Sequence, residues 1–193
     1  MTCTEDLFVE DVKHHVMTVL RDDGVYRHVR FGKPGTNCMQ FDLVTWPGYL
    51  SFSGDMGCYV FTRIHDMFEF FRRDCGINPS YWGEKVAAAQ PDGVTEFSPD
   101  AFRAAIASYL DESEATQELR DEVEAQVLCH ADDGEYAARQ SAGDFEHNGF
   151  QFHDFWEINC SEFSFRFLWC CYALVWGIHR YDDDRDGVTP RGL

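Results

Sequence analysis

Histidine and cysteine are the first residues to consider, because imidazole and thiolate groups bind metals and act in nucleophilic catalysis. The chain has eight of each. The closest groupings are the neighbours His14–His15 and Cys129–His130. Neighbouring side chains point to opposite faces of a strand, or diverge by about 100° on a helix, so neither pair easily shares one ion. CxxC and GxSxG motifs are absent from the sequence. We therefore predict no metal site, no cofactor and no catalytic residue, while a site built from distant residues stays open.

A second grouping is acidic and lies in residues 111–128, DESEATQELRDEVEAQVL. The apolar positions in this segment recur at helical spacing and predict one amphipathic helix. Glu114, Glu118 and Asp121 would follow one side of that helix, about 5–6 Å apart, a spacing comparable to that of phosphates along a strand. A solvated surface would show the same pattern, but we predict a protein-binding acidic face. Its residues are Asp111, Glu114, Glu118, Asp121, Glu122, Asp132 and Asp133.

A third grouping is basic and lies in residues 26–33, YRHVRFGK. Together with the acid of the GDMG turn, it offers an alternative ligand site lined by Arg27, Arg30 and Asp55. Such a site would take a small anion, for example a nucleotide signal. Strand alternation places Arg27 and Arg30 on opposite faces, and salt bridges to the protein's own acids are the simpler interpretation.

Charge and cysteine usage limit the class of protein. The 16 Lys and Arg stand against 34 Asp and Glu, a net charge of −18. This excess disfavours direct binding to nucleic acid or to an anionic membrane surface. The apolar run 167–178 has 12 residues, whereas a membrane-spanning helix needs about 20, so we predict a buried core helix. The first residues lack the pattern of a secretory signal, which leads us to expect reduced thiols and a cytoplasmic location.

The hydrophobic periodicity predicts an α+β fold. Alternating segments separated by Gly and Pro turns predict an antiparallel meander of five strands within residues 16–62, packed against helices. Helical patterns follow over 80–89, 98–110, 111–128 and 162–181. We predict a single domain, 1–193, in which a mainly sheet lobe (1–75) and a mainly helical lobe (76–181) share one core and residues 182–193 form a flexible tail. The predicted core residues are Phe41, Leu43, Leu50, Phe52, Val60, Phe61, Phe68, Phe71, Phe102, Ile106, Leu168, Tyr172 and Trp176.

Three blocks of the sequence resemble a family of accessory proteins encoded by tailed bacteriophages. They are HVRFGKPGTNCMQFDLVTWPGYLSFSGDMGCYVFTRIHDMFEFFR, INPSYWGEK and FRFLWCCYALVWGIHRYD, and they cover roughly half of the chain. The resemblance transfers no catalytic residue. It implies a phage origin and the bacterial host cytoplasm as the place of action.

These observations lead to one expectation of function and two alternatives. We expect a non-enzymatic, anti-CRISPR-like inhibitor whose acidic face occupies the basic surface of a host defence protein or complex, as a nucleic-acid mimic does. The partner is then a protein, with no direct contact to nucleic acid or membrane. The first alternative is a binder or hydrolase of a small anionic nucleotide signal, and the second is a phage protein with a dispensable structural or regulatory role. The sequence does not determine the oligomeric state.

Overall fold

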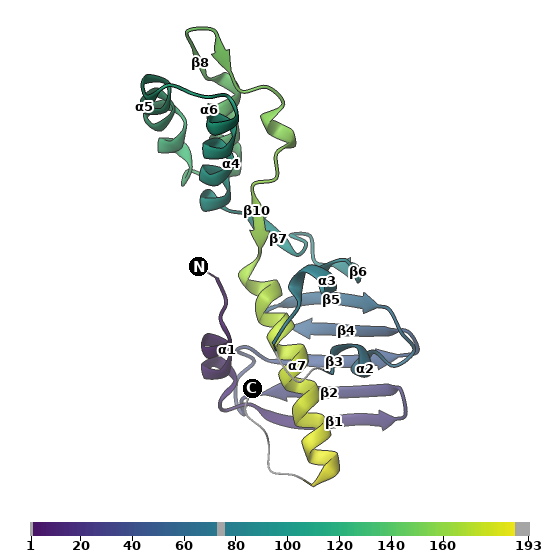
Figure 1. Cartoon of the computed structure of the whole chain (residues 1–193). Coiled ribbons are helices and arrows are strands. Elements are labelled where there is room, and N and C mark those ends of the chain that lie inside the picture. The colour runs from purple at the N-terminus through teal and green to yellow at the C-terminus, as the bar shows by residue number, and fades with distance from the viewer. Residues whose placement is uncertain (1, 73–75, 188–193) are drawn as a thin grey trace. The chain divides into compact units, whose positions relative to one another are not determined.

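The computed structural model describes residues 2–72 and 76–187, which form two compact units (Figure 1). Unit 1 is built from residues 1–94 and 163–193, and unit 2 is the intervening stretch Thr95–Glu162. Each unit has its own cluster of buried hydrophobic residues. The α+β fold class is confirmed. We expected one core shared by a sheet lobe (1–75) and a helical lobe (76–181), but the buried hydrophobic residues form two separate clusters. The last apolar helix packs on the N-terminal sheet, which leaves the middle of the chain to form a core of its own.

Unit 1 contains one six-stranded antiparallel sheet in the order β1-β2-β3-β4-β5-β6. The first five strands are the predicted meander. Burial alternates along β2 to β5, whereas β1, at the edge of the sheet, is almost wholly exposed. On β2, for example, Val29 and Phe31 are buried while Arg30 between them is exposed. The helices and strands before the insertion are α1 (Glu5–Val12), β1 (Val16–Asp23), β2 (Tyr26–Gly32), β3 (Phe41–Trp46), β4 (Tyr49–Gly54), β5 (Gly57–Thr62), α2 (Met67–Phe71), α3 (Pro79–Gly83) and β6 (Val86–Ala89).

The sixth strand replaces the second half of the helix expected over 80–89. Asn78 caps α3 by accepting a hydrogen bond from the Tyr81 amide, and the helix ends at Gly83. Residues Val86–Ala89 then pair with β5, with Ala89 opposite Tyr59. The alanines favour a helix locally, but the open edge of the sheet supplies hydrogen-bond partners that a short isolated helix lacks.

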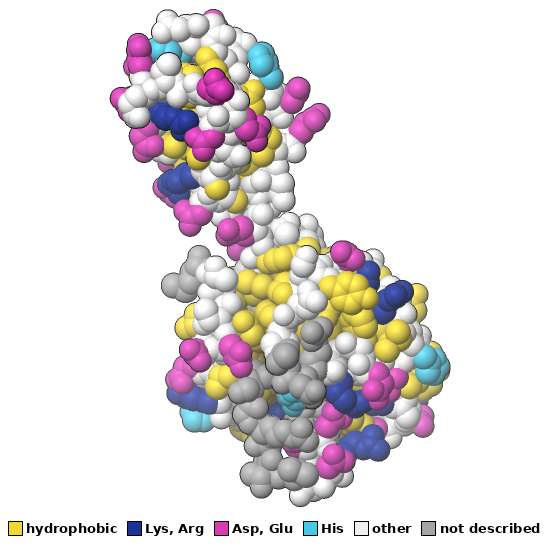
Figure 2. Space-filling model, in the orientation of Figure 1, with side chains coloured by type: hydrophobic (Ala, Val, Ile, Leu, Met, Phe, Trp, Pro, Cys, Tyr) yellow, Lys and Arg dark blue, Asp and Glu magenta, His cyan; other side chains and the backbone are white. Residues whose placement is uncertain are grey.

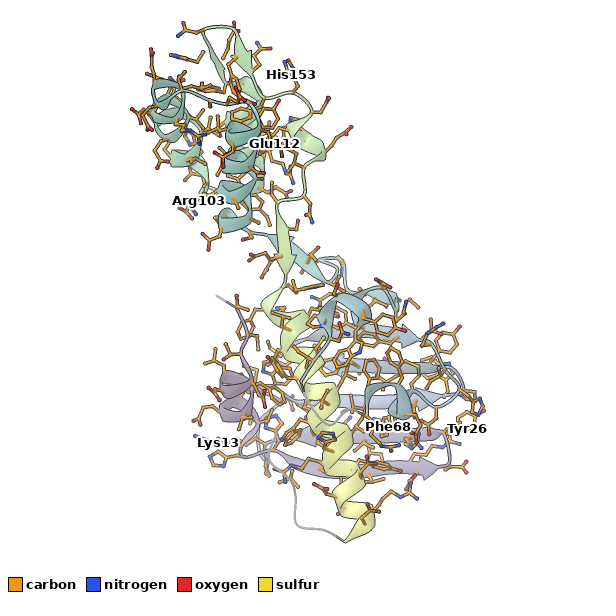
Figure 3. The ribbon with its side chains drawn as sticks, viewed as in Figure 1. Lys13, Tyr26, Phe68, Arg103, Glu112 and His153 are labelled. Carbon is orange, nitrogen blue, oxygen red and sulfur yellow. The ribbon has the colours of Figure 1, made fainter. Side chains whose placement is uncertain are left out.

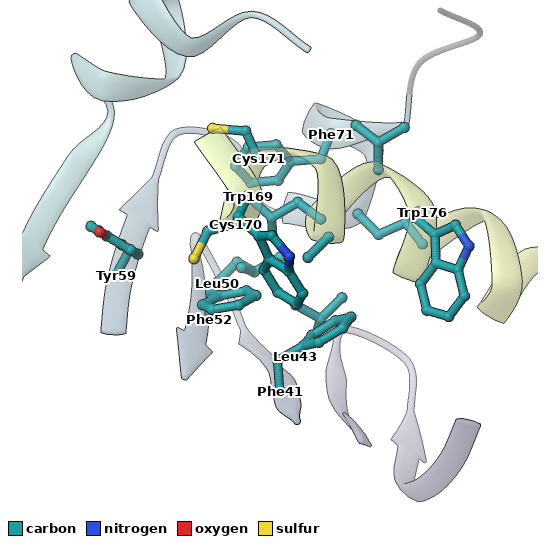
Figure 4. Close-up of a cluster of buried hydrophobic side chains, with 14 of the residues drawn as sticks. Phe41, Leu43, Leu50, Phe52, Tyr59, Phe71, Trp169, Cys170, Cys171 and Trp176 are labelled. Carbon is teal, nitrogen blue, oxygen red and sulfur yellow. The ribbon is translucent and has the colours of Figure 1, made fainter. Parts of the chain in front are cut away.

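The last helix, α7 (Phe165–Asp186), supplies much of the core of unit 1. Figure 4 shows its Trp169 and Cys170 among side chains of the sheet, and the Trp169 ring contacts those of Phe41 and Phe52. Of the predicted core residues, Val60 and Tyr172 are half-buried and the others are buried. Although α7 is the longest described helix, neither it nor any other helix in the described ranges meets the length and apolarity that a bilayer span requires.

The first residues of the expected tail, 182–186, belong to this helix. Residues 182–186 are the last turn of α7, which ends where Gly187 takes a left-handed conformation with φ of 65°. Asp182 is fixed by two hydrogen bonds from Arg72, at 2.7 and 2.8 Å. The prediction of a tail from residue 182 is therefore corrected, and residues 188–193 lie outside the described part.

Unit 2 packs three helices and short strands around a small aromatic and aliphatic core. Ser98 caps α4, and Phe102, Ile106 and Leu110 are buried, as the helical spacing predicted. Phe152 and Phe155 join them in the core. The elements of this part are β7 (Thr95–Phe97), α4 (Pro99–Glu112), α5 (Gln117–Gln126), η1 (Leu128–His130), α6 (Glu135–Asp144), β8 (Glu146–His147), β9 (Phe150–Gln151), η2 (Phe155–Glu157) and β10 (Ser161–Phe163).

Candidate functional site

The acidic charge of the protein is concentrated in unit 2. Residues 95–162 contain 17 Asp and Glu against three Arg and no Lys, a net charge of −14 over 68 residues. The other 125 residues hold 17 acids and 13 bases, a net charge of −4. Sixteen of the 17 acids in unit 2 are exposed and the other, Glu122, is half-buried. Figure 2 shows Asp and Glu side chains spread over the visible surface of this unit. Unit 2 is therefore a small, strongly anionic domain.

The acidic helix predicted over 111–128 is the shorter helix α5, because residues 111 and 112 complete α4 and a turn follows them. Helix α4 ends at Glu112, Ser113 is its C-cap, and Glu114 adopts a left-handed conformation with φ of 51°. A new helix starts at Thr116, whose hydroxyl accepts a hydrogen bond from the Leu119 amide. The expected row of Glu114, Glu118 and Asp121 along one helix is therefore wrong, because Glu114 lies in the turn. The hydroxyl cap at Thr116 offers a local hydrogen bond that a continuous helix would forgo.

Three acids of the predicted face are paired with bases of unit 2. Arg120 donates to Asp111 at 2.7 Å, Arg103 donates to Asp132, and His130 lies 2.9 Å from Asp133. Arg103 and Glu112 are labelled in Figure 3, where the side chains of this unit are drawn. The hydrogen bond to Asp132 raises the pKa of the Arg103 guanidinium.

The acids on helix α5 have little cationic compensation. Asp121 and Glu122 accept hydrogen bonds from the amides of Gln117 and Gln126, which carry no charge. The Glu118 carboxylate lies 3.8 Å from Nε2 of His147, which is charged only when protonated. We call this surface the α5 acidic face, and it comprises Glu118, Asp121, Glu122 and Glu124.

The alternative ligand site does not assemble. Arg27 is buried on the helix-covered face of the sheet, where its guanidinium makes two hydrogen bonds of 2.8 Å to Asp66. Arg30 lies on the opposite face and donates to both oxygens of Asp42, at 2.8 and 2.9 Å. Asp55, in the turn between β4 and β5, accepts a hydrogen bond from the Met39 amide.

The sheet geometry therefore separates the three predicted residues. Arg30 lines an open depression with Lys33 and the loop at 34–37, but its guanidinium is already engaged by a carboxylate. The anionic ligand site expected from Arg27, Arg30 and Asp55 is therefore not a single pocket. Each arginine instead pairs with one of the protein's own acids.

The described residues also show how possible metal ligands and two of the cysteines are placed. Within residues 2–72 and 76–187, no group of three or more His, Cys, Asp and Glu side chains is placed to hold a metal ion. Cys170 and Cys171 are buried in α7, and burial raises the pKa of both thiols well above the ordinary value. A thiol with a raised pKa is a poor nucleophile at neutral pH.

Two residues of unit 2 went unnoticed in the sequence. Tyr136 is 73% exposed and Trp156 is 55% exposed, and both line a depression beside helix α6. The sequence gives only a weak signal for them: Tyr136 lies outside the apolar stripe that includes Ala138 and Ala142, and the aromatic residues near Trp156 in the chain are mostly buried.

Comparison with protein-family models, with curated proteins and with solved structures finds no match to this chain.

Proposed function

We propose that this protein is a non-enzymatic inhibitor whose unit 2 binds the basic, nucleic-acid-binding surface of another protein. The observation that carries the proposal is the segregation of charge, −14 in 68 residues against −4 in the remaining 125. Acids that serve only solubility need no such concentration. A net charge of −14 equals that of about seven base pairs of duplex DNA.

The same charge selects the class of partner. Phosphate groups are repelled by unit 2, whereas a groove lined by Lys and Arg attracts it and accelerates association at low ionic strength. The acids are accessible to such a partner, because sixteen of the 17 are exposed. The salt bridges of the three Arg of unit 2 engage Asp100, Asp111, Asp132 and Glu135. A partner that normally holds nucleic acid has the required surface.

The bacterial setting is the next part of the proposal. The sequence resemblance to tailed-phage accessory proteins supports a host defence complex as the target, a CRISPR effector among them, in the host cytoplasm. On this proposal the protein excludes the guide or target nucleic acid by occupying its site. It needs no cofactor to do so.

The test is capture of the target from a lysate and measurement of its nucleic-acid binding. Tagged protein is incubated with nuclease-treated lysate of a bacterium carrying active defence systems, at 50 mM and 500 mM NaCl. We expect one nucleic-acid-binding complex at low salt, lost at high salt because screening lengths shorten. In a gel-shift assay, the captured complex should lose its nucleic acid as this protein is added.

Two variants, each with four acids replaced by neutral amides, make the test specific. E118Q/D121N/E122Q/E124Q neutralises the four acids of the α5 acidic face, and the control E5Q/E10Q/E84Q/D92N neutralises four exposed acids of unit 1. The first variant should lose capture and inhibition, while the control should retain both. Equal loss in the two variants, or capture that resists 500 mM salt, would contradict the proposal.

A further inference from the structure

The large hydrophobic side chains that unit 2 exposes line one depression. Tyr136 and Trp156 are the only large hydrophobic residues of the fully described stretch 95–162 that are exposed. With Glu135 and Arg139 they line an open depression of about 470 Å³. Exposed aromatic residues within a polar surface are typical of contact sites for partner proteins.

The backbone that carries Trp156 is fixed by hydrogen bonds from Arg139. Arg139 is 7% exposed, and its Nη1 donates to the carbonyl oxygens of Phe155, Trp156 and Ile158, at 3.3, 3.4 and 3.1 Å. These bonds fasten η2 to helix α6. The indole Nε1 lies 3.3 Å from the position that a β-carbon on Gly143 would occupy, so this glycine leaves room for the ring. A side chain fixed before binding loses little entropy when a partner covers it.

The charges around the aromatic pair favour a cation. The guanidinium of Arg139 is compensated by the three carbonyls and by Glu135, whose carboxylate accepts a 2.9 Å bond from Nε. Two exposed acids, Asp154 and Glu157, lie within two residues of Trp156 in the chain. An aromatic face attracts a cation, and carboxylates around it strengthen that preference. A nucleotide base would also stack on these rings, but its phosphate would meet the negative field of the unit.

We propose that Tyr136 and Trp156 receive an arginine side chain, or in second place a lysine, from the basic partner protein. Arginine comes first because its planar guanidinium stacks on an aromatic ring while its N–H groups reach carboxylates at the edge. This inference rests on the proposed function, because it assumes a basic protein partner. It adds a specific anchor to an interaction that charge alone would leave unspecific.

The probes are fluorescent nona-arginine and nona-lysine peptides, titrated into the full-length protein by anisotropy at 150 mM NaCl. The wild type should bind nona-arginine more tightly than nona-lysine. Trp156→Ala should weaken nona-arginine binding about three- to tenfold and bring the two peptides to the same affinity. Trp156→Phe should keep most of the preference, which separates loss of the ring from loss of the fold. Tyr26→Ala is the matched control, because Tyr26 is an exposed tyrosine near Asp22 and Asp23 in unit 1.

The variants distinguish failure of the anchor from failure of the proposed function. If E118Q/D121N/E122Q/E124Q weakens both peptides while Trp156→Ala changes neither, the acidic domain stands and the anchor is overturned. If the wild type binds neither peptide, both proposals are overturned. If Trp156→Ala abolishes capture of a lysate partner but leaves nona-arginine binding unchanged, the aromatic pair meets an apolar surface, and the cation assignment is wrong.

Discussion

Replacing Arg27 by methionine should destabilise unit 1 by about 3 kcal/mol. The guanidinium is held by two 2.8 Å bonds to Asp66, and the two side chains are only 8% and 22% exposed. It also lies 4.8 Å from the ring centroid of Phe68. Methionine keeps the apolar stem but leaves Asp66 as a largely buried carboxylate without its cation. Removing one partner of a buried pair costs about 3–5 kcal/mol, and the partial exposure of Asp66 places this case at the lower end.

The matched control is Arg30→Met on the other face of the same strand. Arg30 likewise makes a bidentate contact to Asp42, but the Arg30 side chain is 45% exposed. The Asp42 carboxylate also lies 2.8 Å from Nε2 of His28. Arg30→Met should therefore cost less than Arg27→Met, because the Arg30 guanidinium is solvated and the Asp42 carboxylate keeps His28 as a partner. Urea unfolding in a Trp156→Phe background measures both, because the remaining four tryptophans all lie in unit 1.

A double-mutant cycle with Asp66→Asn completes the test of the Arg27–Asp66 pair. The two single changes should be strongly non-additive, because each removes the same interaction. Equal, small losses for Arg27→Met and Arg30→Met, or an additive cycle, would refute the reasoning. That result would return Arg27 to the set of residues free to bind a ligand.

Four further outcomes follow from the described contacts. Burial alone would raise the pKa of Asp66, but hydrogen bonds from Arg27 and from the Phe68 amide lower it overall. The stability it contributes is therefore complete above its unfolded pKa of about 3.9 and is lost as the pH falls through the lower folded value, which urea midpoints at pH 7 and pH 3 would reveal. Gly177→Val should destabilise unit 1 by about 2 kcal/mol in the same urea assay, because a β-carbon there lies 3.0 Å from Leu43 and 3.1 Å from Phe31. Thiol titration of native protein followed by peptide mapping should label the exposed Cys38, Cys58 and Cys129 rapidly, and the buried Cys3, Cys160, Cys170 and Cys171 only after unfolding. Raising NaCl from 20 mM to 500 mM should stabilise unit 2 more than unit 1, and amide hydrogen exchange of the two stretches would contradict this if protection rose equally.

The placement of charge also has a consequence for folding. Acids that repel one another destabilise a compact state, and here most of that repulsion falls on 68 residues with a separate hydrophobic core. Unit 1 has a nearly balanced charge, and its core is formed by α7 and the strands of the meander. A surface of high charge density is thus separated from the larger hydrophobic core of unit 1.

Local signals predicted most of the elements. Alternating apolar residues and Gly–Pro turns identified the five-stranded meander, and the Ser98–Pro99 start identified helix α4. They failed where partners distant in the sequence decide the outcome. Residues 86–89 form a strand because the edge of β5 is available to them. A break between the two helices was predicted after residue 110, but its true position was within reach of sequence reasoning, because Thr116 is a good helix cap two residues after Glu114.

The sequence by itself determined the excess of acid, the class of fold and the burial of the long C-terminal helix, because these depend on composition and on periodicity along the chain. The tertiary structure alone decided that residues 95–162 form a separate unit, and hence that most of the net charge lies in it. It also decided that Arg27 and Arg30 face opposite sides of the sheet with acids of their own, and that Tyr136 and Trp156 line one depression. These features depend on which distant segments pack together, and packing is settled by the sum of many weak contacts that no local pattern records.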